Sequence, residues 1–371
     1  MRICQLLHAM TTGGAEVLAD RIGRRFRDRH DVVFACLDGL GELGQALRDD
    51  GYTVEVLDRG AGIDTGCMRR LARTFRGLRV DLIHAHQYTP FFYAAASRLC
   101  GHRLPIVFTE HGRFFPDYPS RKRAVFNRWM LRRRDRVVAV GRQVRQALVA
   151  NESIPADRIE VIYNGIDLTA YAGGDCAEQR RAVRGDLRLG GDDFVIAQVA
   201  RLDSIKDHVT SVRALALLAA RRPGVHLLII GDGPQRSEIA AEIERQGVGG
   251  RVHLLGLRRD VPALLAACDA AMLTSLSEGI PLSLIEGMAQ GLPVVSTDVG
   301  GVREVVTEGG NGLLCPVGDA TAIASALGRL ADDGAFRQRL GQDGRQAARE
   351  RFGEEQMFAQ YERLFDQVAA A

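Results

Sequence analysis

The sequence predicts an α/β protein made of two Rossmann-like, doubly wound domains in series. Apolar, strand-like runs alternate with amphipathic runs of helix length along the whole chain, as in parallel sheets with crossover helices. The length of 371 residues is too great for one ordinary core and suits two domains of roughly 150 to 190 residues. A stretch at 171–192, rich in Gly, Asp and Arg, lacks a clean period and is typical of a linker.

The first domain is therefore expected at 1–170 and the second at 193–352, followed by a C-terminal helical segment at 353–371. Strands of the first domain are predicted within residues 2–10, 31–38, 52–58, 81–88, 105–111 and 136–141. Strands of the second are predicted within 194–202, 226–233, 252–256, 270–275, 293–298 and 311–316. Two such domains facing each other leave a cleft at the carboxyl ends of their strands, where ligands bind. Candidate functional residues are thus expected in the loops that follow strands.

The composition, 46% hydrophobic and 26% charged, is that of a globular protein, and no run reaches the roughly 18 apolar residues of a membrane span. The opening "RICQLLHAM" is short and mixed, so it indicates a first strand rather than a signal peptide, and we expect a cytoplasmic protein. The seven cysteines are odd in number, spread out and never in a C-x-x-C pair. This pattern argues against a disulfide framework and a zinc site.

The positive charge is concentrated in the first half of the chain. Residues 1–170 carry 27 basic and 19 acidic side chains, a balance of +8, while the remainder carries 22 and 27, a balance of −5. Only Lys122 and Lys206 are lysines among the 49 basic residues. The split favours an anionic surface or ligand as partner of the first half.

A dinucleotide-binding pattern follows the second predicted strand. Gly39, Gly41 and Gly44 spell G-x-G-x-x-G, and Asp58 stands where a ribose-binding acid would lie. The pattern belongs on the first strand of such a domain, whereas here the first strand leads to "TTGGAE". A tight turn explains the glycines equally, so an NAD-dependent oxidoreductase remains an alternative.

Two cations follow the first strand of the second domain. Arg201 and Lys206 lie in the loop "ARLDSIKDH", where they could grip a diphosphate. Solvated surface charges are the ordinary explanation for each residue alone. Farther on, Asp260 is expected to be the N-cap of a helix, and Leu257 and Arg258 before it could contact a base through their backbone.

The segment "SEGIPLSLIEGMAQGLP" places two carboxylates around a predicted helix start. We expect a helix from about Pro281 to Gln290, ended by Gly291, with Glu278 in the preceding loop and Glu286 on the helix. Amides near the start of this helix would favour an anion. A diphosphate could bind at this helix start and at the two cations, while hydroxyl-rich rings on either side of it contact the carboxylates. A ligand with these groups is a nucleotide sugar.

At these residues the chain resembles the retaining glycosyltransferases of the GT-B fold, in the large family numbered four. The shared motifs are "TTGGAE", "TEHG", "VIYNGID", "ARLDSIKD", "GDGP" and "SEGIPLSLIEGMAQGLPVVSTDVGG". The resemblance implies that Arg201 and Lys206 bind the donor diphosphate. It implies that Glu278 holds the donor sugar near C3 and C4 and that Glu286 takes the nucleotide ribose. It further assigns donor contacts to Gly13, Gly14, Gly279, Ile280, Pro281 and Leu282, and places His111 near the transferred sugar.

The resemblance also implies the reaction: a hexosyl group moves from a UDP- or GDP-linked sugar to a carbohydrate or lipid-linked acceptor with retention of configuration. The expected process is assembly of a surface polysaccharide or glycoconjugate. Two basic groups and a helix start can stabilise the leaving diphosphate, and no D-x-D motif is present, so neither a metal nor a further cofactor is implied. The C-terminal helix is expected to cross back onto the first, acceptor-side domain.

Three histidines, His84, His86 and His111, fall at predicted strand ends, and each is ordinarily a satisfied polar residue. Only the "TEHG" motif distinguishes His111 from the other two.

The segment Arg121 to Arg136 carries eight basic residues and one acid, with apolar positions 125, 126, 129 and 130 on one helical face. One interpretation packs this face on the sheet and leaves the arginines solvated. The other makes the segment a docking surface for anionic membrane or a lipid-linked acceptor, through Arg121, Lys122, Arg123, Arg128, Arg132 and Arg133. Nucleic acid fits less well, because no recognition module is visible.

A GT-B relative that is not a transferase, such as a sugar-nucleotide epimerase or a noncatalytic binding partner, is the second alternative.

Overall fold

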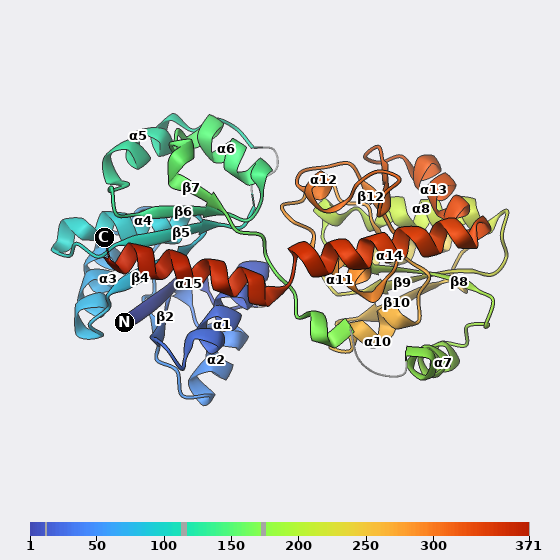
Figure 1. Ribbon diagram of the computed structural model, residues 1–371, viewed down its shortest axis with the longest axis horizontal. Helices are drawn as coiled ribbons and strands as arrows, with labels where there is room; N and C mark the ends of the chain where they lie inside the picture. Colours follow the sequence, from blue (N-terminus) through green and yellow to red (C-terminus); the bar gives the residue numbers. More distant parts are fainter. Residues whose placement is uncertain (12, 113–116, 172–175, 371) are drawn as a thin grey trace. The chain divides into compact units, whose positions relative to one another are not determined.

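The computed structural model describes residues 1–11, 13–112, 117–171 and 176–370 (Figure 1). The chain divides into two compact units, Met1–Asn164 with Met357–Ala371, and Gly165–Gln356. Residues 172–175 of the predicted linker lie outside the described residues. The rest of that stretch contains helix α7 (Cys176–Asp186), whose Arg180 and Arg184 pair with Asp269 of the second unit.

The first unit is built on a parallel sheet of seven strands in the order β3-β2-β1-β4-β5-β6-β7. All six strands expected here are present, and a short seventh strand was not foreseen. The central strands β4 and β5 are buried from end to end, as parallel strands covered on both faces must be. The strands are β1 (Arg2–Ala9), β2 (Asp31–Gly39), β3 (Val54–Val56), β4 (Leu82–His86), β5 (Ile106–Glu110), β6 (Arg136–Ala139) and β7 (Ile159–Val161).

Helices follow the strands of the first unit and cover its sheet (Figure 1). They carry a buried stripe at helical spacing, as in α1, where Leu18, Ala19, Ile22 and Phe26 are buried. The helices are α1 (Gly14–Phe26), α2 (Gly41–Asp49), α3 (Thr65–Gly77), α4 (Tyr88–Ala96), α5 (Arg121–Met130) and α6 (Arg142–Glu152), with short 3-10 turns η1 (Ser97–Cys100) and η2 (Ala156–Arg158).

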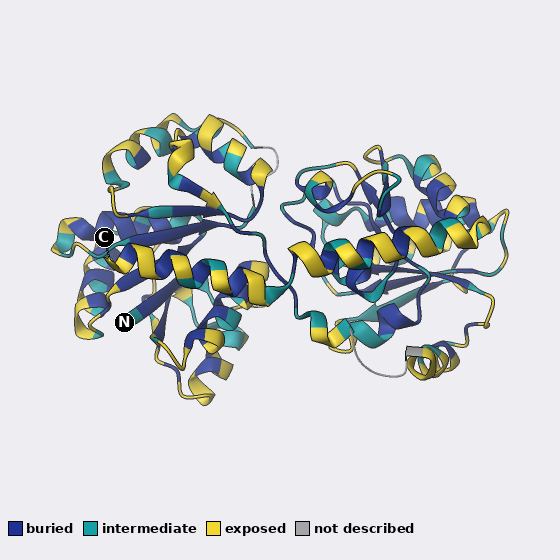
Figure 2. Cartoon of the chain, in the orientation of Figure 1, coloured by how far each residue is buried: buried dark blue, intermediate teal, exposed yellow. Residues whose placement is uncertain are grey.

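The last helix, α15 (Glu354–Ala370), completes the core of the first unit. Figure 2 shows α15 with buried and exposed positions alternating along its length. Tyr361 and Phe365 are fully buried, and the Phe365 ring lies 5.8 Å from that of Phe26 and 5.3 Å from that of His84. Residues from the two ends of the sequence, Phe26 and Phe365, thus share one cluster.

The second unit has a parallel sheet of six strands in the order β10-β9-β8-β11-β12-β13, and all six were expected. They are β8 (Phe194–Val199), β9 (Val225–Ile230), β10 (Val252–Gly256), β11 (Ala270–Leu273), β12 (Val294–Thr297) and β13 (Gly312–Cys315). The helical elements are η3 (Leu168–Tyr171), α7, η4 (Ser204–Lys206), α8 (His208–Ala219), α9 (Arg236–Arg245), α10 (Val261–Ala266), α11 (Leu282–Gln290), α12 (Val302–Val305), α13 (Ala320–Asp332) and α14 (Gly334–Arg351).

Each sheet reverses its strand order beside its first strand. In the first unit β1 pairs with both β2 and β4, and in the second unit β8 pairs with both β9 and β11. Crossover helices leave such a point in opposite directions, so the loops at the carboxyl ends of the two strands part there. The predicted fold class is confirmed, and it locates a candidate site in each unit.

Replacement of Phe365 by Ala should destabilise the first unit by about 3 to 5 kcal/mol, because the ring is fully buried among aromatic neighbours. Calorimetric unfolding would measure the loss. The exposed neighbour Gln367→Ala is the matched control and should leave the transition within about 0.5 kcal/mol of its original position. Equal effects of the two substitutions would contradict the role given to α15.

Candidate functional site

An ion pair joins the two loops at the switch point of the second unit. Lys206 Nζ, at the end of η4 after β8, donates to Glu278 Oε1, after β11, at 2.6 Å. Ser275 Oγ donates to the same carboxylate oxygen at 2.6 Å. The Glu278 side chain is only 8% exposed and that of Lys206 23%. The residues that the sequence pattern assigned to a diphosphate and to a sugar are thus in direct contact.

Thr274 ties the backbones of these loops together. Its hydroxyl donates toward the carbonyls of Lys206 and Asp207, at 3.0 and 2.8 Å, and accepts from Gln198 Nε2 at 3.1 Å. Thr297 Oγ1 donates to the Ser275 carbonyl at 2.6 Å. Sequence reasoning missed Thr274, Ser275 and Thr297. Their positions are a signal that could have identified them, because Thr274 and Ser275 directly follow β11 and Thr297 is the last residue of β12.

The loop after β12 packs directly against the Glu278 loop. Gly300 has φ +52°, and a Cβ there would lie 1.9 Å from the Glu278 carbonyl oxygen. A Cβ at Gly301 would lie 1.9 Å from the Gly279 carbonyl oxygen, while the Gly301 amide donates to Glu278 O at 3.2 Å. The two glycines of "DVGG" are therefore needed for this close approach of backbones.

Arg201 lies in the same loop after β8 as Lys206, five residues before it. Its side chain is exposed and makes no hydrogen bond or ion pair with any residue that the structure describes. The neighbouring "GDGP" loop packs on the same segment, since a Cβ at Gly231 would lie 2.0 Å from Ala200 O and one at Gly233 would lie 2.4 Å from Leu202 O. Arg201 is thus a cation on a firmly packed loop.

Helix α11 begins at Leu282, and Pro281 is its N-cap without a side-chain hydrogen bond. The amides of Leu284 and Ile285 donate to the Pro281 carbonyl, whereas those of Leu282 and Ser283 have no acceptor within the helix and can donate to an anion. Gly291 ends the helix with φ +86°, as predicted. Glu286 is half-buried on this helix, and Ile280 and Pro281 are buried before it.

Leu257 and Arg258 follow the edge strand β10 and are exposed. Asp260 occupies the N-cap of α10, as expected, but its side chain makes no cap. It instead accepts from Arg258 Nε at 2.7 Å and Nη2 at 2.5 Å. The ion pair uses the Arg258 side chain and leaves only its backbone for the predicted contact.

In the first unit, Gly13 and Gly14 begin helix α1 after β1. Gly13 is the N-cap, and a Cβ there would meet the carboxylate of Glu16. Gly14 is exposed, and apart from its own helix backbone and chain neighbours a Cβ there would have no atom of the described residues within 4 Å. Open space above a helix start is compatible with the predicted approach of a ligand.

The three histidines form a cluster in which His84 and His86 are buried and His111 is half-buried. His86 Nδ1 lies 2.9 Å from His111 Nε2, and His84 Nε2 lies 2.8 Å from Thr109 Oγ1. Burial lowers the pKa of His84 and of His111 to about 3 and that of His86 well below its ordinary value. All three rings are therefore neutral at physiological pH.

The backbone amides of the dinucleotide-binding pattern are already hydrogen-bonded within the protein. The amides of Leu43 and Gly44, in the first turn of α2, donate to the Met10 carbonyl at 2.9 and 3.3 Å. Gly41 has φ +70°, and a Cβ there would lie 2.2 Å from the same oxygen. Those amides would have to hold a pyrophosphate in an oxidoreductase, so the geometry argues against that alternative.

The basic helix α5 differs from the interpretation that packs its apolar face on the sheet. Val125 is 60% exposed and Trp129 79%, whereas Phe126 packs near Phe92, with 4.7 Å between ring centroids. Arg123 is directed inward, where it donates to buried Glu152 at 2.8 Å. The other five cations proposed for docking, Arg121, Lys122, Arg128, Arg132 and Arg133, are exposed.

Within the described ranges, no three or more His, Cys, Asp or Glu side chains are grouped so that they could hold a metal ion. The same part of the chain includes no helix with the length and apolar character needed to traverse a bilayer.

Two family models together match most of the chain. Residues 12–170 match Glycosyltransferase Family 4, and residues 179–347 match Glycosyl transferases group 1. A D-inositol 3-phosphate glycosyltransferase of Nocardia farcinica is 32% identical over 333 residues, which cover 84% of this chain and 69% of the relative. The chain belongs to the group 1 glycosyltransferases. The predicted family is confirmed, and the enzyme uses a nucleotide sugar as donor.

Other relatives of this glycosyltransferase match nearly its full length. An N-acetyl-alpha-D-glucosaminyl L-malate synthase of Bacillus anthracis is 26% identical over 370 residues, covering 96% of this chain and 95% of the relative. The crystal structure of Anabaena Alr3699/HepE in complex with UDP has a TM-score of 0.87 and 25% identity, and covers 99% of this chain and 100% of the other. The same Anabaena protein is also known in complex with UDP-glucose.

Gly300→Ala should destabilise the second unit several-fold more than Gly309→Ala. Both glycines have positive φ, which costs an L-residue about 1 kcal/mol, but only Gly300 has a backbone oxygen in the way. A Cβ at Gly309 has no atom within 4 Å, so this variant is the control for strain alone. Thermal unfolding measures both, and equal shifts would contradict the close packing of the Glu278 loop.

The first unit should lose stability below pH 6.5 through His84. Its folded pKa of about 3 lies under the ordinary value, so the unfolded chain binds more protons as the pH falls. Stability from this group is complete above about pH 6.5, and about 2 kcal/mol is lost by pH 5. Hydrogen exchange of β4 and β5 amides should show a smaller loss between pH 7 and 5 in His84→Gln than in the wild type. Parallel losses would refute the assignment.

Proposed function

We propose that the enzyme transfers a hexosyl group from a UDP- or GDP-linked sugar to a hydroxyl of a carbohydrate or lipid-linked acceptor, with retention of configuration. The observation that carries this proposal is the Lys206–Glu278 pair at the switch point of the second sheet. It combines a cation, a carboxylate and the start of α11 within one set of loops. These groups suit the diphosphate and the hydroxyl-rich sugar of one ligand.

The chemistry follows from charge. When the bond between the anomeric carbon and the diphosphate oxygen breaks, negative charge grows on the leaving diphosphate. Arg201 and Lys206 supply positive charge there, and the amides of the first turn of α11 supply donors. Glu278 is held by Lys206 and Ser275 on one oxygen, which orients it to accept from sugar hydroxyls. Glu286 is proposed to bind the nucleotide ribose.

A uridine nucleotide is the first donor to test, because the Anabaena structures contain UDP and UDP-glucose. Two relatives are named for L-malate and D-inositol 3-phosphate, both of which are anionic. The balance of +8 in residues 1–170, from 27 basic and 19 acidic side chains, supports an anionic acceptor here also. We place the reaction in the assembly of a surface polysaccharide or glycoconjugate.

Slow hydrolysis of UDP-, GDP- and ADP-sugars tests the proposal without a known acceptor. We expect release of one nucleoside diphosphate from one class of donor, and proton NMR of a transfer product should show the anomeric configuration of the donor. Formation of an epimer only, or binding without turnover, would refute the transferase assignment. Inversion in the product would refute retention alone.

Substitutions of Glu278 and Glu286 should affect different quantities, the turnover number and the affinity for UDP. Glu286→Ala should weaken UDP binding by about tenfold, whereas Glu278→Ala should lower the turnover number by at least that factor with a smaller change in UDP affinity. Calorimetric titration with UDP and the hydrolysis assay measure the two quantities. Equal UDP binding by the wild type and both variants would contradict this division.

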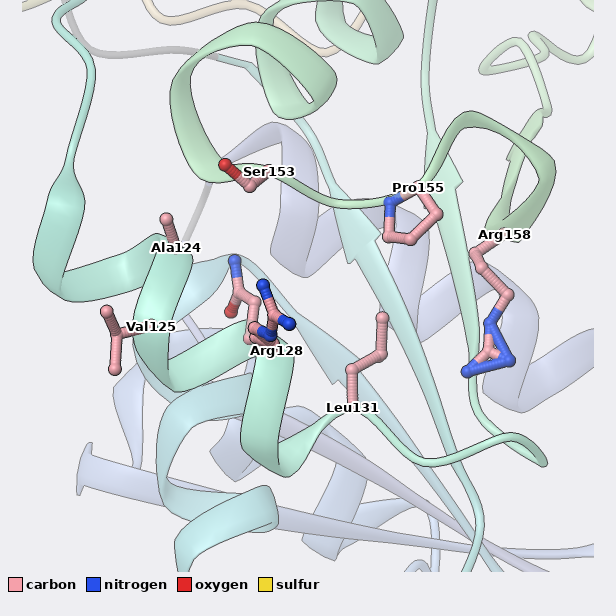
Figure 3. A pocket seen from close by; sticks show the side chains of 8 residues that line it. Ala124, Val125, Arg128, Leu131, Ser153, Pro155 and Arg158 are labelled. Atoms are coloured by element: carbon pink, nitrogen blue, oxygen red, sulfur yellow. The ribbon is translucent and has the colours of Figure 1, made fainter.

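We further propose that α5 and its flanks contact an anionic membrane. Exposed Val125 and Trp129 lie beside the five exposed cations, so apolar and basic groups share one surface. Next to them a cavity of about 460 Å³ is lined by Val125, Leu131 and Pro155 and by Arg128 and Arg158 (Figure 3). Its mixed lining suits an anionic amphiphile.

Trp129→Ser should reduce binding to phosphatidylglycerol vesicles several-fold, because it removes the largest exposed apolar side chain of α5. Ile63→Ser, which changes a 72% exposed side chain elsewhere in the first unit, is the control. Co-sedimentation at fixed lipid measures the bound fraction. Binding that is equal for phosphatidylcholine vesicles, or equally reduced by both substitutions, would contradict a basic membrane surface.

A further inference from the structure

The pairing between β1 and β2 shifts its register opposite His8. Leu7 of β1 pairs with Cys36 of β2. The next pair is Ala9 with Gly39, so β2 holds one residue more than β1 between the two pairs. A shift of this kind is a β-bulge, which redirects side chains and is common beside active sites. This bulge lies at the carboxyl end of β1, where the sheet reverses its strand order and where ligands bind in such folds.

The bulge brings Asp38 to the same side of the sheet as His8. Leu7 and Cys36 belong to one core cluster on one face. His8 follows Leu7 by one position, whereas Asp38 follows Cys36 by two. Regular alternation would therefore direct the His8 and Asp38 side chains to opposite faces. Instead, His8 Nδ1 lies 2.9 Å from Asp38 Oδ2. The ladder is thus interrupted at the point where a histidine and a carboxylate meet.

Arg59, in the loop after β3, fixes this carboxylate. Its Nε donates to Asp38 Oδ1 at 2.6 Å, and its Nη2 donates to Oδ2 at 2.9 Å. Its backbone amide donates to the Leu37 carbonyl, inside the bulge, at 2.8 Å, and its guanidinium lies 5.5 Å from the ring centroid of buried Tyr93. Burial acts to raise the pKa of Asp38, but the hydrogen bonds from Arg59 and His8 hold it below its ordinary value. The carboxylate is therefore oriented and ionised.

The ionised carboxylate determines which nitrogen of His8 carries the proton. A carboxylate can only accept, so His8 Nδ1 must be the donor. In a neutral imidazole the other nitrogen, Nε2, then bears the lone pair. His8 Nε2 makes no hydrogen bond with any residue that the structure describes, and the side chain is 32% exposed. His8 Nε2 is therefore an oriented acceptor that a ligand can reach.

We propose that His8 Nε2 accepts a hydrogen bond from a hydroxyl of the acceptor, and that Asp38 and Arg59 are positioning residues that hold its ring. The inference rests on the proposed function for the identity of that ligand, a carbohydrate acceptor. Glu16 of α1 also interacts electrostatically with His8. Two carboxyl groups beside the ring favour a neutral hydroxyl over an anion, so other groups would hold any phosphate or carboxylate of the acceptor.

Long-range proton–nitrogen NMR of the full chain labelled with ¹⁵N-histidine tests the tautomer at about pH 8, where an ordinary imidazole is neutral. The His8 signals are assigned by their loss in His8→Gln. We expect the Nδ1–H tautomer in the wild type and a shift toward Nε2–H in Asp38→Ala, which removes the carboxylate. An Nε2–H tautomer in the wild type, or an unchanged tautomer in a folded Asp38→Ala, would overturn the inference. The wild-type spectrum is decisive even if Asp38→Ala does not fold.

D-glucose is the hydroxyl-bearing probe for binding. In the presence of UDP, it should shift the Nε2 signal of His8 more than the signals of His102. His102 is the matched control because both of its nitrogens have partners, Ser97 Oγ at 2.8 Å from Nε2 and the Leu104 amide at 3.4 Å from Nδ1. A His8 signal that D-glucose leaves unchanged, or shifts no more than those of His102, would overturn the proposed contact.

The ratio of sugar transfer to hydrolysis separates an acceptor contact from a donor contact, because D-glucose and water compete for the same donor. His8→Asn, whose amide reaches only the position of Nδ1, should lower this ratio about tenfold. His8→Gln, whose amide reaches the position of Nε2, should lower it less, and His102→Asn should leave it unchanged. Equal ratios in His8→Asn and the wild type would overturn the role of His8.

The two measurements also separate this site from the proposed function. The Nδ1–H tautomer and the D-glucose shift in a wild type without turnover would support the His8 site and contradict the transferase assignment. Turnover by a wild type with the Nε2–H tautomer would overturn the His8 site and leave the function standing.

Discussion

The reversal of strand order beside the first strand of each sheet is the constraint on which the candidate site depends. Parallel strands connected by crossover helices bring their carboxyl ends to one edge, and the reversal parts the loops at that edge. In the second unit these are the loops after β8 and β11, which carry Lys206 and Glu278. In the first unit the loop after β1 carries Gly13 and Gly14, and β4 ends at His86. The topology therefore brings the loops that carry functional side chains together, whatever residues those loops contain.

Local chemistry then fixes those loops in place. The Lys206–Glu278 pair is largely buried, so each charge needs the other to offset its lost hydration. Thr274 and the glycines after β12 hold the backbones that carry the pair. A site built on packed loops loses little entropy when it orders a ligand, which is the physical advantage of such preorganisation. The positive charge of Lys206 is offset by Glu278, so exposed Arg201 supplies additional positive charge to the site.

The sequence was sufficient for the fold class, for twelve of the thirteen described strands and for the family, because buried parallel strands give continuous apolar runs and the motifs are long. It was insufficient for β7, whose three residues carry no such run. The contact between Lys206 and Glu278 joins positions 72 apart and depends on a tertiary arrangement that spacing does not encode. On α5 the helical period identified one apolar face correctly, but period alone cannot decide whether packing or solvent covers it. The prediction that the histidines fall at strand ends is confirmed for His86 and His111 but wrong for His84, which lies inside β4. The hydrogen bonds of His86 to Gln5 and of His84 to Thr109 required the register of the sheet.

The position of α15 has a consequence for biosynthesis. The core that surrounds Phe26 and His84 includes Tyr361 and Phe365, so the first unit lacks part of its interior until those residues have left the ribosome. The second unit, residues 165–356, contains its own sheet and core and needs no residue of α15 beyond Gln356. A nascent first unit exposes the apolar surface that α15 later covers, and it is at that stage a natural client for a chaperone.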